Sequence, residues 1–360
     1  MEQNQEQAFK AEYYGFQAGA KRLNYAMIGV TDRTPVYAQM HEFTMHELGI
    51  SAKTFYTTPE ILVPATLEIA ERYDLDAGFV DYDVYNIEVE ALGQKVVYFE
   101  NHIPDVDRST PIITGPEDLN KIRTPDFDIS GRFTNVIEMQ SIYEKLTGLL
   151  PALQFCAPFS MAANLRGIGN LLLDMQMNPG FARGIFDAIV EEVLAPWIYY
   201  QKKNFPDAIS IAGADAMSSL PILNFNMFEE WVVPYILRLR DICGPEVYVL
   251  NWVGERFLKK PEEMLALKLR VSPGFLEGQD PDVSALGPTI YKKYAETHAV
   301  PLVLGVGASF LAQAAPEEVC ERVQNYIKVG GKNGRFALYL CNLGATTPAE
   351  NIRAAIEAVV

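Results

Sequence analysis

The sequence is poor in cysteine and has no long apolar run. Its 360 residues include four cysteines and no CxxC pair, so neither a disulfide framework nor a paired-thiol metal site is expected. No apolar run approaches the roughly 20 residues that span a bilayer. The first fifteen residues are polar and acidic, without the basic and apolar regions of a signal peptide. These absences predict a cytoplasmic protein.

Positive charge is also scarce. The chain has 30 Lys and Arg against 46 Asp and Glu, which gives a formal net charge of -16. A chain this acidic is poorly suited to phosphate backbones or anionic lipid, so we expect neither a nucleic-acid nor a membrane partner. Hydrophobic residues make up 49% and charged residues 21% of the chain, a balance that predicts a large core rather than disorder.

Short apolar runs, each followed by an amphipathic stretch, recur along the whole chain. Near-continuous apolar runs are typical of parallel strands buried on both faces. Eight such alternations favour a (β/α)8 TIM barrel, an α/β fold, over a doubly wound sheet, and they predict a single barrel domain over residues 1–360. The expected strands are residues 35–40, 77–81, 153–157, 208–212, 247–251, 274–277, 302–306 and 336–341.

Two segments do not fit the simple alternation. Residues 84–150 are too long for one crossover and hold a hairpin pattern at 95–99, so we expect an insertion between strands two and three. Residues 1–32 precede the first strand, and their apolar residues lie at helical spacing. They predict an N-terminal helical arm.

Polar residues follow several expected strands, at the barrel face where enzymes of this fold place reactive groups. Asp81 and Asp83 share a face if their strand continues, and paired carboxylates can supply an acid beside a base; loop capping is the alternative. His41 and His46 are five residues apart and would not share a helix face. Each fits a catalytic or metal-binding role, or an ordinary hydrogen-bonded or surface histidine. Cys341 fits a thiolate ligand or a small core residue.

Four segments carry a resemblance to a known family. Residues 32–36 (DRTPV), 76–83 (DAGFVDYD), 157–162 (APFSMA) and 347–352 (TPAENI) resemble the opening, second-strand, third-strand and closing motifs of the uroporphyrinogen decarboxylase superfamily. The resemblance covers nearly the whole chain. It implies a (β/α)8 barrel and places Asp83 at the position of the family's catalytic aspartate.

The decarboxylase branch of the superfamily fits poorly. Its arginine-rich stretch after strand one is replaced here by residues 39–44 (QMHEFT), and only Arg33 remains nearby. A polycarboxylate such as uroporphyrinogen needs cations in its pocket. The thiol-methylating branch fits poorly as well, because its zinc-binding His-x-Cys at the end of strand five reads Asn251 and Val253 here. Cys341 alone matches the third ligand of that branch.

A third branch resembles this chain more closely. The ether-cleaving methyltransferases of anaerobic O-demethylase systems carry a zinc pattern of Glu, fourteen residues, Glu, twenty residues, His, which Glu262, Glu277 and His298 match. The expected strand order nevertheless puts His298 before strand seven, at the opposite end of the barrel. If His298 is not a ligand, His41 or His46 is the expected substitute.

This resemblance implies transfer of a methyl group from a small aromatic methyl ether, of the vanillate or veratrol type, to the cob(I)alamin of a partner corrinoid protein. Zinc or an acid would activate the ether oxygen. The expected catalytic residues are Asp83, Asp81 and His41, and the arm at 1–32 is expected to close over the pocket. The alternatives are a tetrapyrrole decarboxylase and a non-catalytic corrinoid-binding module. The expected substrate-binding residues, which could also be ordinary core, are Met40, Tyr82, Tyr85, Asn251, Trp252 and Cys341.

Overall fold

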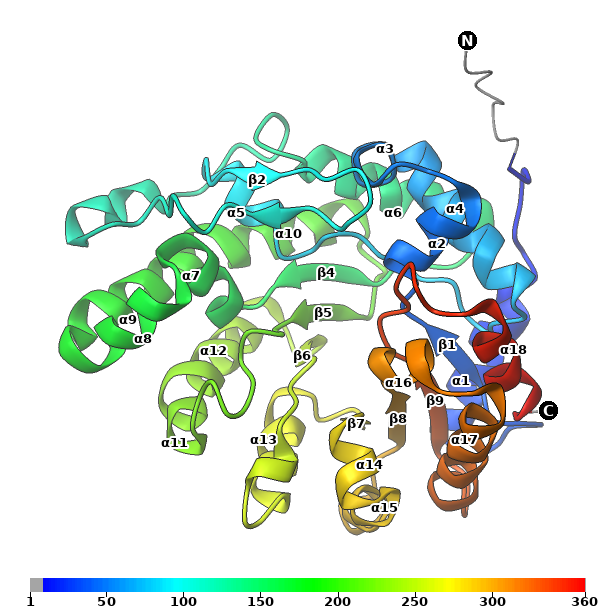
Figure 1. Ribbon diagram of the computed structural model, residues 1–360. Coiled ribbons are helices and arrows are strands. Elements are labelled where there is room, and N and C mark those ends of the chain that lie inside the picture. The colour runs from blue at the N-terminus through cyan, green and yellow to red at the C-terminus, as the bar shows by residue number, and fades with distance from the viewer. Residues whose placement is uncertain (1–8, 360) are drawn as a thin grey trace.

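Parallel strands arranged around a common centre form the middle of the molecule. The computed structural model describes residues 9–359. One sheet has the order β1 (Val36–Ala38), β9 (Phe336–Leu340), β8 (Leu302–Val306), β7 (Leu276–Gln279), and the other has the order β4 (Leu153–Cys156), β5 (Ile211–Ala214), β6 (Val247–Leu250). Figure 1 shows both sheets facing a shared interior with helices outside. The predicted α/β barrel-like fold is confirmed.

The hydrogen-bond ladder has two seams rather than full closure. Residues 77–81 stand at the second strand position, but they make only a parallel bridge from Ala77 to Tyr37. The side-chain amide of Gln154 in β4 donates to the carbonyl of Val80 at 2.7 Å and spans the first seam. The second seam lies between β6 and β7, which are not paired. Both seams fall between the two sheets.

Two strands begin later in the sequence than predicted because the parallel register determines which of their residues pair with the neighbouring strands. Ile211 of β5 pairs with Leu153 and with Val247, so β5 spans 211–214 rather than 208–212. Ile209 belongs to the apolar run in the sequence but is 84% exposed. In the same way β7 occupies 276–279 rather than 274–277, because Leu276 pairs with Leu302.

Helices surround the barrel, and several begin at the proline-marked positions that the sequence indicates. Two long helices each contain a π turn just before a proline, Pro196 or Pro234. A proline has no N–H to donate, and the widened turn accommodates that loss without ending the helix. The segments are α9 (Pro179–Ala188), η2 (Ile189–Leu194) and α10 (Ala195–Asn204), then α11 (Phe225–Met227), η3 (Phe228–Val232) and α12 (Val233–Cys243).

The remaining helices follow the strand order around the barrel. None of the helices within residues 9–359 is both long and apolar enough to cross a membrane. Their bounds are α1 (Phe16–Met27), α2 (His41–Leu48), α3 (Ala52–Thr57), α4 (Pro59–Arg72), α5 (Ile87–Ala91), η1 (Pro116–Lys121), α6 (Phe133–Thr147), α7 (Pro158–Arg166), α8 (Ile168–Met177), η4 (Glu255–Phe257), α13 (Glu262–Val271), α14 (Asp282–Leu286), α15 (Pro288–Thr297), α16 (Ala308–Gln313), α17 (Pro316–Gly330) and α18 (Ala349–Glu357).

The long segment between the second and third strand positions holds a small hairpin. Strand β2 (Val96–Val97) pairs antiparallel with β3 (Asp105–Val106), at the site where the sequence indicates a hairpin. Helix α6 then packs against α4 and leads into β4. The segment therefore adds a layer over one side of the barrel (Figure 1).

Helix α1 lies at the amino-terminal ends of the strands. Arg22 pairs with Asp76, which immediately precedes the second strand position, and Arg335, just before β9, donates to the carbonyl of Met27 at 3.3 Å. The prediction that the arm closes over the pocket is therefore wrong for residues 9–32, because the reactive face of a barrel is at the carboxyl ends of its strands. Residues 1–8 of the predicted arm lie outside the described residues.

We expect Gly19→Ala to destabilise the protein although alanine is the better helix former. A Cβ on Gly19 would overlap the backbone carbonyl of Asp76, so α1 would have to move away from the barrel, at a cost of about 1–3 kcal/mol. Chemical denaturation measures the change. Gly169→Ala in α8 is the matched control, because a Cβ there meets nothing within 4 Å. We expect it to be neutral or stabilising, and an equal loss in both variants would contradict the contact.

Candidate functional site

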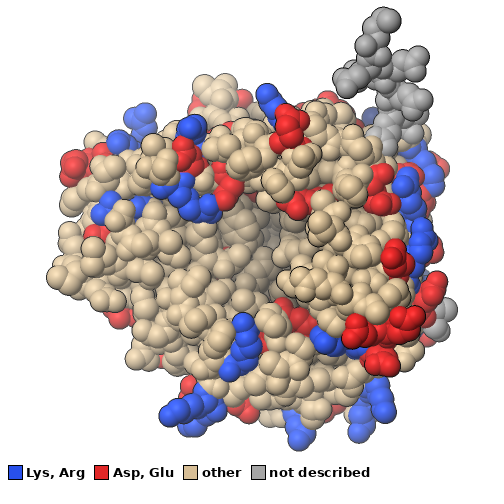
Figure 2. All heavy atoms as spheres, in the orientation of Figure 1, with Lys and Arg blue, Asp and Glu red and all other residues tan. Residues whose placement is uncertain are grey.

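Polar and aromatic side chains line the inside of the barrel. Tyr37, Gln154, Tyr248 and Tyr339 are partly exposed although their neighbours in the strands are buried. They alternate along the strands with residues buried on the opposite, helix-covered face, so they point inward. Inward side chains that keep some exposure indicate a lumen that is not completely filled. Figure 2 shows a hollow near the centre of the viewed face.

A hydrogen-bonded cluster lies where β1 and the second strand position end. The hydroxyl of Tyr339 donates to Gln39 Oε1 at 2.8 Å, which turns the Gln39 amide nitrogen toward Asp81 Oδ1 (3.0 Å) and His41 Nε2 (2.8 Å). The hydroxyl of Tyr56 is 3.3 Å from His41 Nδ1. The structure thus brings together two of the predicted catalytic residues, His41 and Asp81.

Asp81 has the character of an acid. Its Oδ1 accepts the Gln39 amide, while its buried Oδ2 has no hydrogen-bond partner. Burial raises the pKa of Asp81, and the nearby His41 only partly opposes this. A carboxyl in this setting retains its proton to higher pH than an exposed aspartate.

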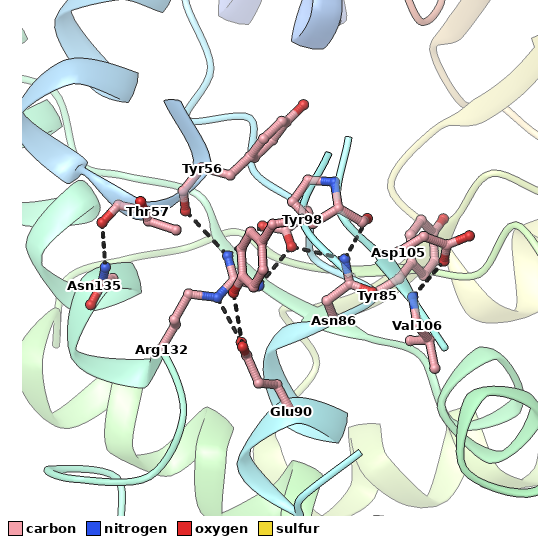
Figure 3. A network of polar contacts seen from close by, with 12 residues as sticks. Tyr56, Thr57, Tyr85, Asn86, Glu90, Tyr98, Asp105, Val106, Arg132 and Asn135 are labelled. Atoms are coloured by element: carbon pink, nitrogen blue, oxygen red, sulfur yellow. Dashed lines mark hydrogen bonds and ion pairs between the residues drawn. The ribbon is translucent and has the colours of Figure 1, made fainter. Parts of the chain in front are cut away.

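Asp83 lies in a different environment. Arg132, the N-cap of α6, binds both of its oxygens, at 2.8 and 2.6 Å, and the Asn86 amide donates to Oδ2 at 2.8 Å. Arg132 also binds Glu90 at 2.6 Å and the carbonyl of Tyr56 at 3.2 Å (Figure 3). Asp83 is 1% exposed. It is therefore a fully partnered carboxylate within the wall.

The predicted Asp81–Asp83 pair does not form in this structure. After Asp81 the chain turns, as the bond from the Val84 N–H to the Tyr82 carbonyl shows, so the alternation of a regular strand no longer applies. The two carboxyls face different partners, Gln39 and His41 for Asp81 and Arg132 for Asp83. They cannot share a proton in this arrangement.

Glu277 is the second acid of the lumen. It is the second residue of β7, 8% exposed, and accepts a hydrogen bond from the side chain of Gln279. Burial raises its pKa, and the ammonium of Lys268 opposes the rise. Its charge acts on Tyr37 and Tyr339 across the lumen. Glu277 also lines a small cavity at the seam between β6 and β7, beside Asn251 and Trp252.

The predicted zinc ligands do not converge. Glu262 is exposed in the first turn of α13, and His298 is exposed at the end of α15, where its ring stacks on Tyr294 at 4.1 Å. Glu277 faces the lumen instead. Of the proposed substitutes, His41 is bound to Asp81 and Gln39, and His46 is exposed. Among residues 9–359, no three His, Cys, Asp or Glu side chains gather around a metal-sized space. These donor sets do not fit zinc.

The predicted substrate-binding residues divide into two groups. Met40 and Tyr82 are buried core residues, and Trp252 is buried with its indole N–H donating to Asp215 at 3.0 Å, so none of the three offers a face to a ligand. Tyr85 and Asn251 are half-buried, and the hydroxyl of Tyr85 accepts the N–H of Ala216 at 3.1 Å.

Cys341 is nearly buried beside the lumen. Burial raises the pKa of its thiol, with Glu277 and Asp280 adding to the rise. A protonated thiol is a poor metal ligand, so the core interpretation of Cys341 fits its surroundings better.

Several residues of the site are not evident from the sequence. Gln39 and Tyr339 orient the cluster from β1 and β9, which are far apart in the chain but paired in the sheet. Arg132 comes from the long segment after the second strand position. Glu88 is the one with a local signal, since it lies between Ile87 and Val89 in a buried stretch.

We expect Glu88→Gln to make the folding stability of the protein less dependent on pH between about 5 and 8. Glu88 Oε1 accepts the N–H of Cys156 at 3.0 Å, Oε2 has no partner, and burial raises its pKa from 4.5 to about 8. The folded state therefore holds a proton that the unfolded chain releases, so stability falls as pH rises from about 5 to 8. The substituted amide cannot ionise and should remove at least about 1 kcal/mol of this loss. Denaturation curves at both ends of that pH range measure it, and parallel pH profiles for the two proteins would contradict the assignment.

Comparison with known proteins places this geometry in a family. A model of the uroporphyrinogen decarboxylase (URO-D) family matches residues 21–360. The methylated-thiol–coenzyme M methyltransferase of Methanosarcina mazei is 26% identical over 179 residues, which is 48% of this chain and 46% of that protein. The alignment thus spans about half the length of that relative.

A solved structure shows that the likeness in fold extends further. A methyltransferase from Methanosarcina mazei matches with a TM-score of 0.76, covering 95% of this chain and 98% of that one at 19% identity. Both relatives are methyltransferases by name, and the structural match shows that this chain shares the fold. Because the family model matches nearly the entire sequence, the chain belongs to the uroporphyrinogen decarboxylase family.

Proposed function

We propose that this protein is a methyltransferase that moves a methyl group from a small phenyl methyl ether to the reduced corrinoid of a partner protein. Its family and its two methyltransferase relatives support methyl transfer. The observation that carries the proposal is the Asp81–His41–Gln39 cluster, which sets a buried acid beside the aromatic side chains of the inner wall.

An ether needs help at its oxygen because a phenolate is a modest leaving group. A reduced corrinoid, brought by its own protein, would supply the nucleophile that accepts the methyl group. Asp81 would give its proton to the ether oxygen as the carbon–oxygen bond breaks, so that a neutral phenol leaves. Gln39 and His41 hold Oδ1 of Asp81 in place, which leaves Oδ2 to carry the proton.

Aromatic side chains offer a surface for the ring of the donor. Tyr37 stacks on Tyr339 with ring centroids 5.0 Å apart, and Phe79 meets Tyr37 edge-on at 5.3 Å. All three remain half-buried on the inner wall. Offset and edge-to-face contacts of this kind favour an arene.

A methylated thiol is a second candidate donor, favoured by the name of the relative that shares half of this chain. The positions that would correspond to the zinc-binding His and Cys of the thiol-methylating branch hold Asn251 and Val253 here, and neither is a usual zinc ligand. These residues favour the ether, and the same experiment distinguishes the two donors.

The test combines the full chain with a reduced corrinoid protein and a panel of methyl donors. The panel contains methoxylated aromatics, a methylated thiol, methanol and methylamine, and the corrinoid absorbance reports methylation. We expect transfer from aromatic ethers. Transfer only from the thiol would replace the proposed donor, and transfer from none would end the proposal. Glu262→Gln and His298→Gln are the controls and should leave transfer unchanged, since both residues are exposed.

A further inference from the structure

The charged groups along the inner wall are predominantly acidic. The phenols of Tyr37, Tyr248 and Tyr339 each lie within the field of Glu277, and Tyr339 also lies within that of Asp81. Every neighbouring charge that acts on these three phenols raises the pKa; no lysine or arginine lowers it. Within the described residues, the ionisable side chain that acts on all three phenols is therefore an acid, Glu277.

The nearest cations are already committed to carboxylates. Lys268 is buried, forms an ion pair with Glu255 and donates to the backbone carbonyl of Glu277 at 3.2 Å. The ammonium of Lys268 is thus paired with the carboxyl of Glu255 and contacts only the backbone of Glu277.

The guanidinium of Arg132 is similarly occupied. It binds both Asp83 and Glu90, and its side chain is 9% exposed. Neither this arginine nor Lys268 is free to receive an anionic ligand. His41 is the remaining basic side chain of the site, and it already contacts Asp81 at 3.2 Å.

We propose that the lumen accepts uncharged or cationic methyl donors and rejects donors that carry a carboxylate or sulfonate. The proposal rests on the proposed function, in which the lumen holds the donor, and narrows its substrate class to neutral ethers of the veratrol type rather than benzoates. An anion in this space would lose its water without gaining a cation, next to Glu277. The half-buried rings of Tyr37 and Tyr339 suit a neutral or positively charged guest equally well.

Binding of three matched probes tests the preference. The compounds 4-methoxybenzyl alcohol, 4-methoxybenzoate and 4-methoxybenzylamine share the ring and the ether but differ in charge. Calorimetry with the full chain and no corrinoid gives their affinities. We expect the benzoate to bind on the order of 10-fold more weakly than the alcohol, and the amine to bind at least as tightly as the alcohol. Benzoate binding equal to that of the alcohol, or binding of none of the three, overturns the proposal.

Two variants connect the preference to Glu277. Glu277→Gln should reduce the ratio between alcohol and benzoate affinity, whereas Glu277→Asp, which retains the carboxyl group, should preserve it. Glu263→Gln, at an exposed position in α13, should leave the ratio unchanged. An unchanged ratio in Glu277→Gln, or an equal loss of the ratio in Glu277→Asp, overturns the proposal. If the charge preference is observed but no methyl transfer occurs, only the proposed function is contradicted. If methyl transfer occurs and the benzoate binds as tightly as the alcohol, only this inference is contradicted.

Discussion

Arg132→Met is expected to lower the free energy of unfolding by about 3–5 kcal/mol, because it leaves a buried carboxylate without its cation. Asp83 is 1% exposed and relies on Arg132 for bonds to both oxygens, with Asn86 adding one. Arg132 also joins α6 to α5 through Glu90. Methionine fills a similar volume but supplies no charge. Urea denaturation measures the loss.

An exposed ion pair provides the control for Arg132. Arg108 pairs with Asp105, and both side chains are nearly half exposed, so Arg108→Met should cost less than about 1 kcal/mol. Arg132→Met combined with Asp83→Asn should cost less than the sum of the two single changes, since the double variant leaves no unpaired charge. Additive losses would contradict the direct pairing. The network also implies that Asp83→Asn alone loses stability, so its effect on activity has to be separated from folding.

Asp81→Asn is expected to slow methyl transfer about 100-fold while the affinity for the donor is retained, because the side chain keeps its shape but loses its proton. Burial raises the pKa of Asp81, so the protonated form declines as pH rises. The wild-type rate should therefore fall on the alkaline side, and the variant should lose that dependence. Single-turnover rates across a pH series measure both effects.

Asp74→Asn is the matched control for Asp81→Asn. Asp74 is exposed, and its backbone has a positive φ of 53°, which asparagine tolerates. We expect no change in its rate or in its pH profile. If Asp81→Asn transfers methyl groups at the wild-type rate, the proton comes from another group, and Glu277 would be the next to test.

The residues of the site differ in how far local sequence could predict them. His41, Asp81 and Glu277 follow or belong to apolar strands, and the ends of parallel strands meet at one face of a barrel, so their position was predictable. Asp83 was assigned by resemblance and stands two residues after Asp81, but a turn directs it to Arg132 instead. The spacing of Glu262, Glu277 and His298 matches a zinc pattern, but linear spacing does not determine where α13 and α15 begin and end.

The sequence by itself determined the barrel class, the family and the acidic charge of this protein, because apolar periodicity, short motifs and composition are local properties. Only the tertiary structure decided which carboxyl retains a proton, which is paired with an arginine and where α1 lies. Those outcomes depend on contacts between segments far apart in the chain, such as Gln39 with Tyr339 or Asp83 with Arg132, and burial in the folded state, rather than residue type, sets the charge of each group.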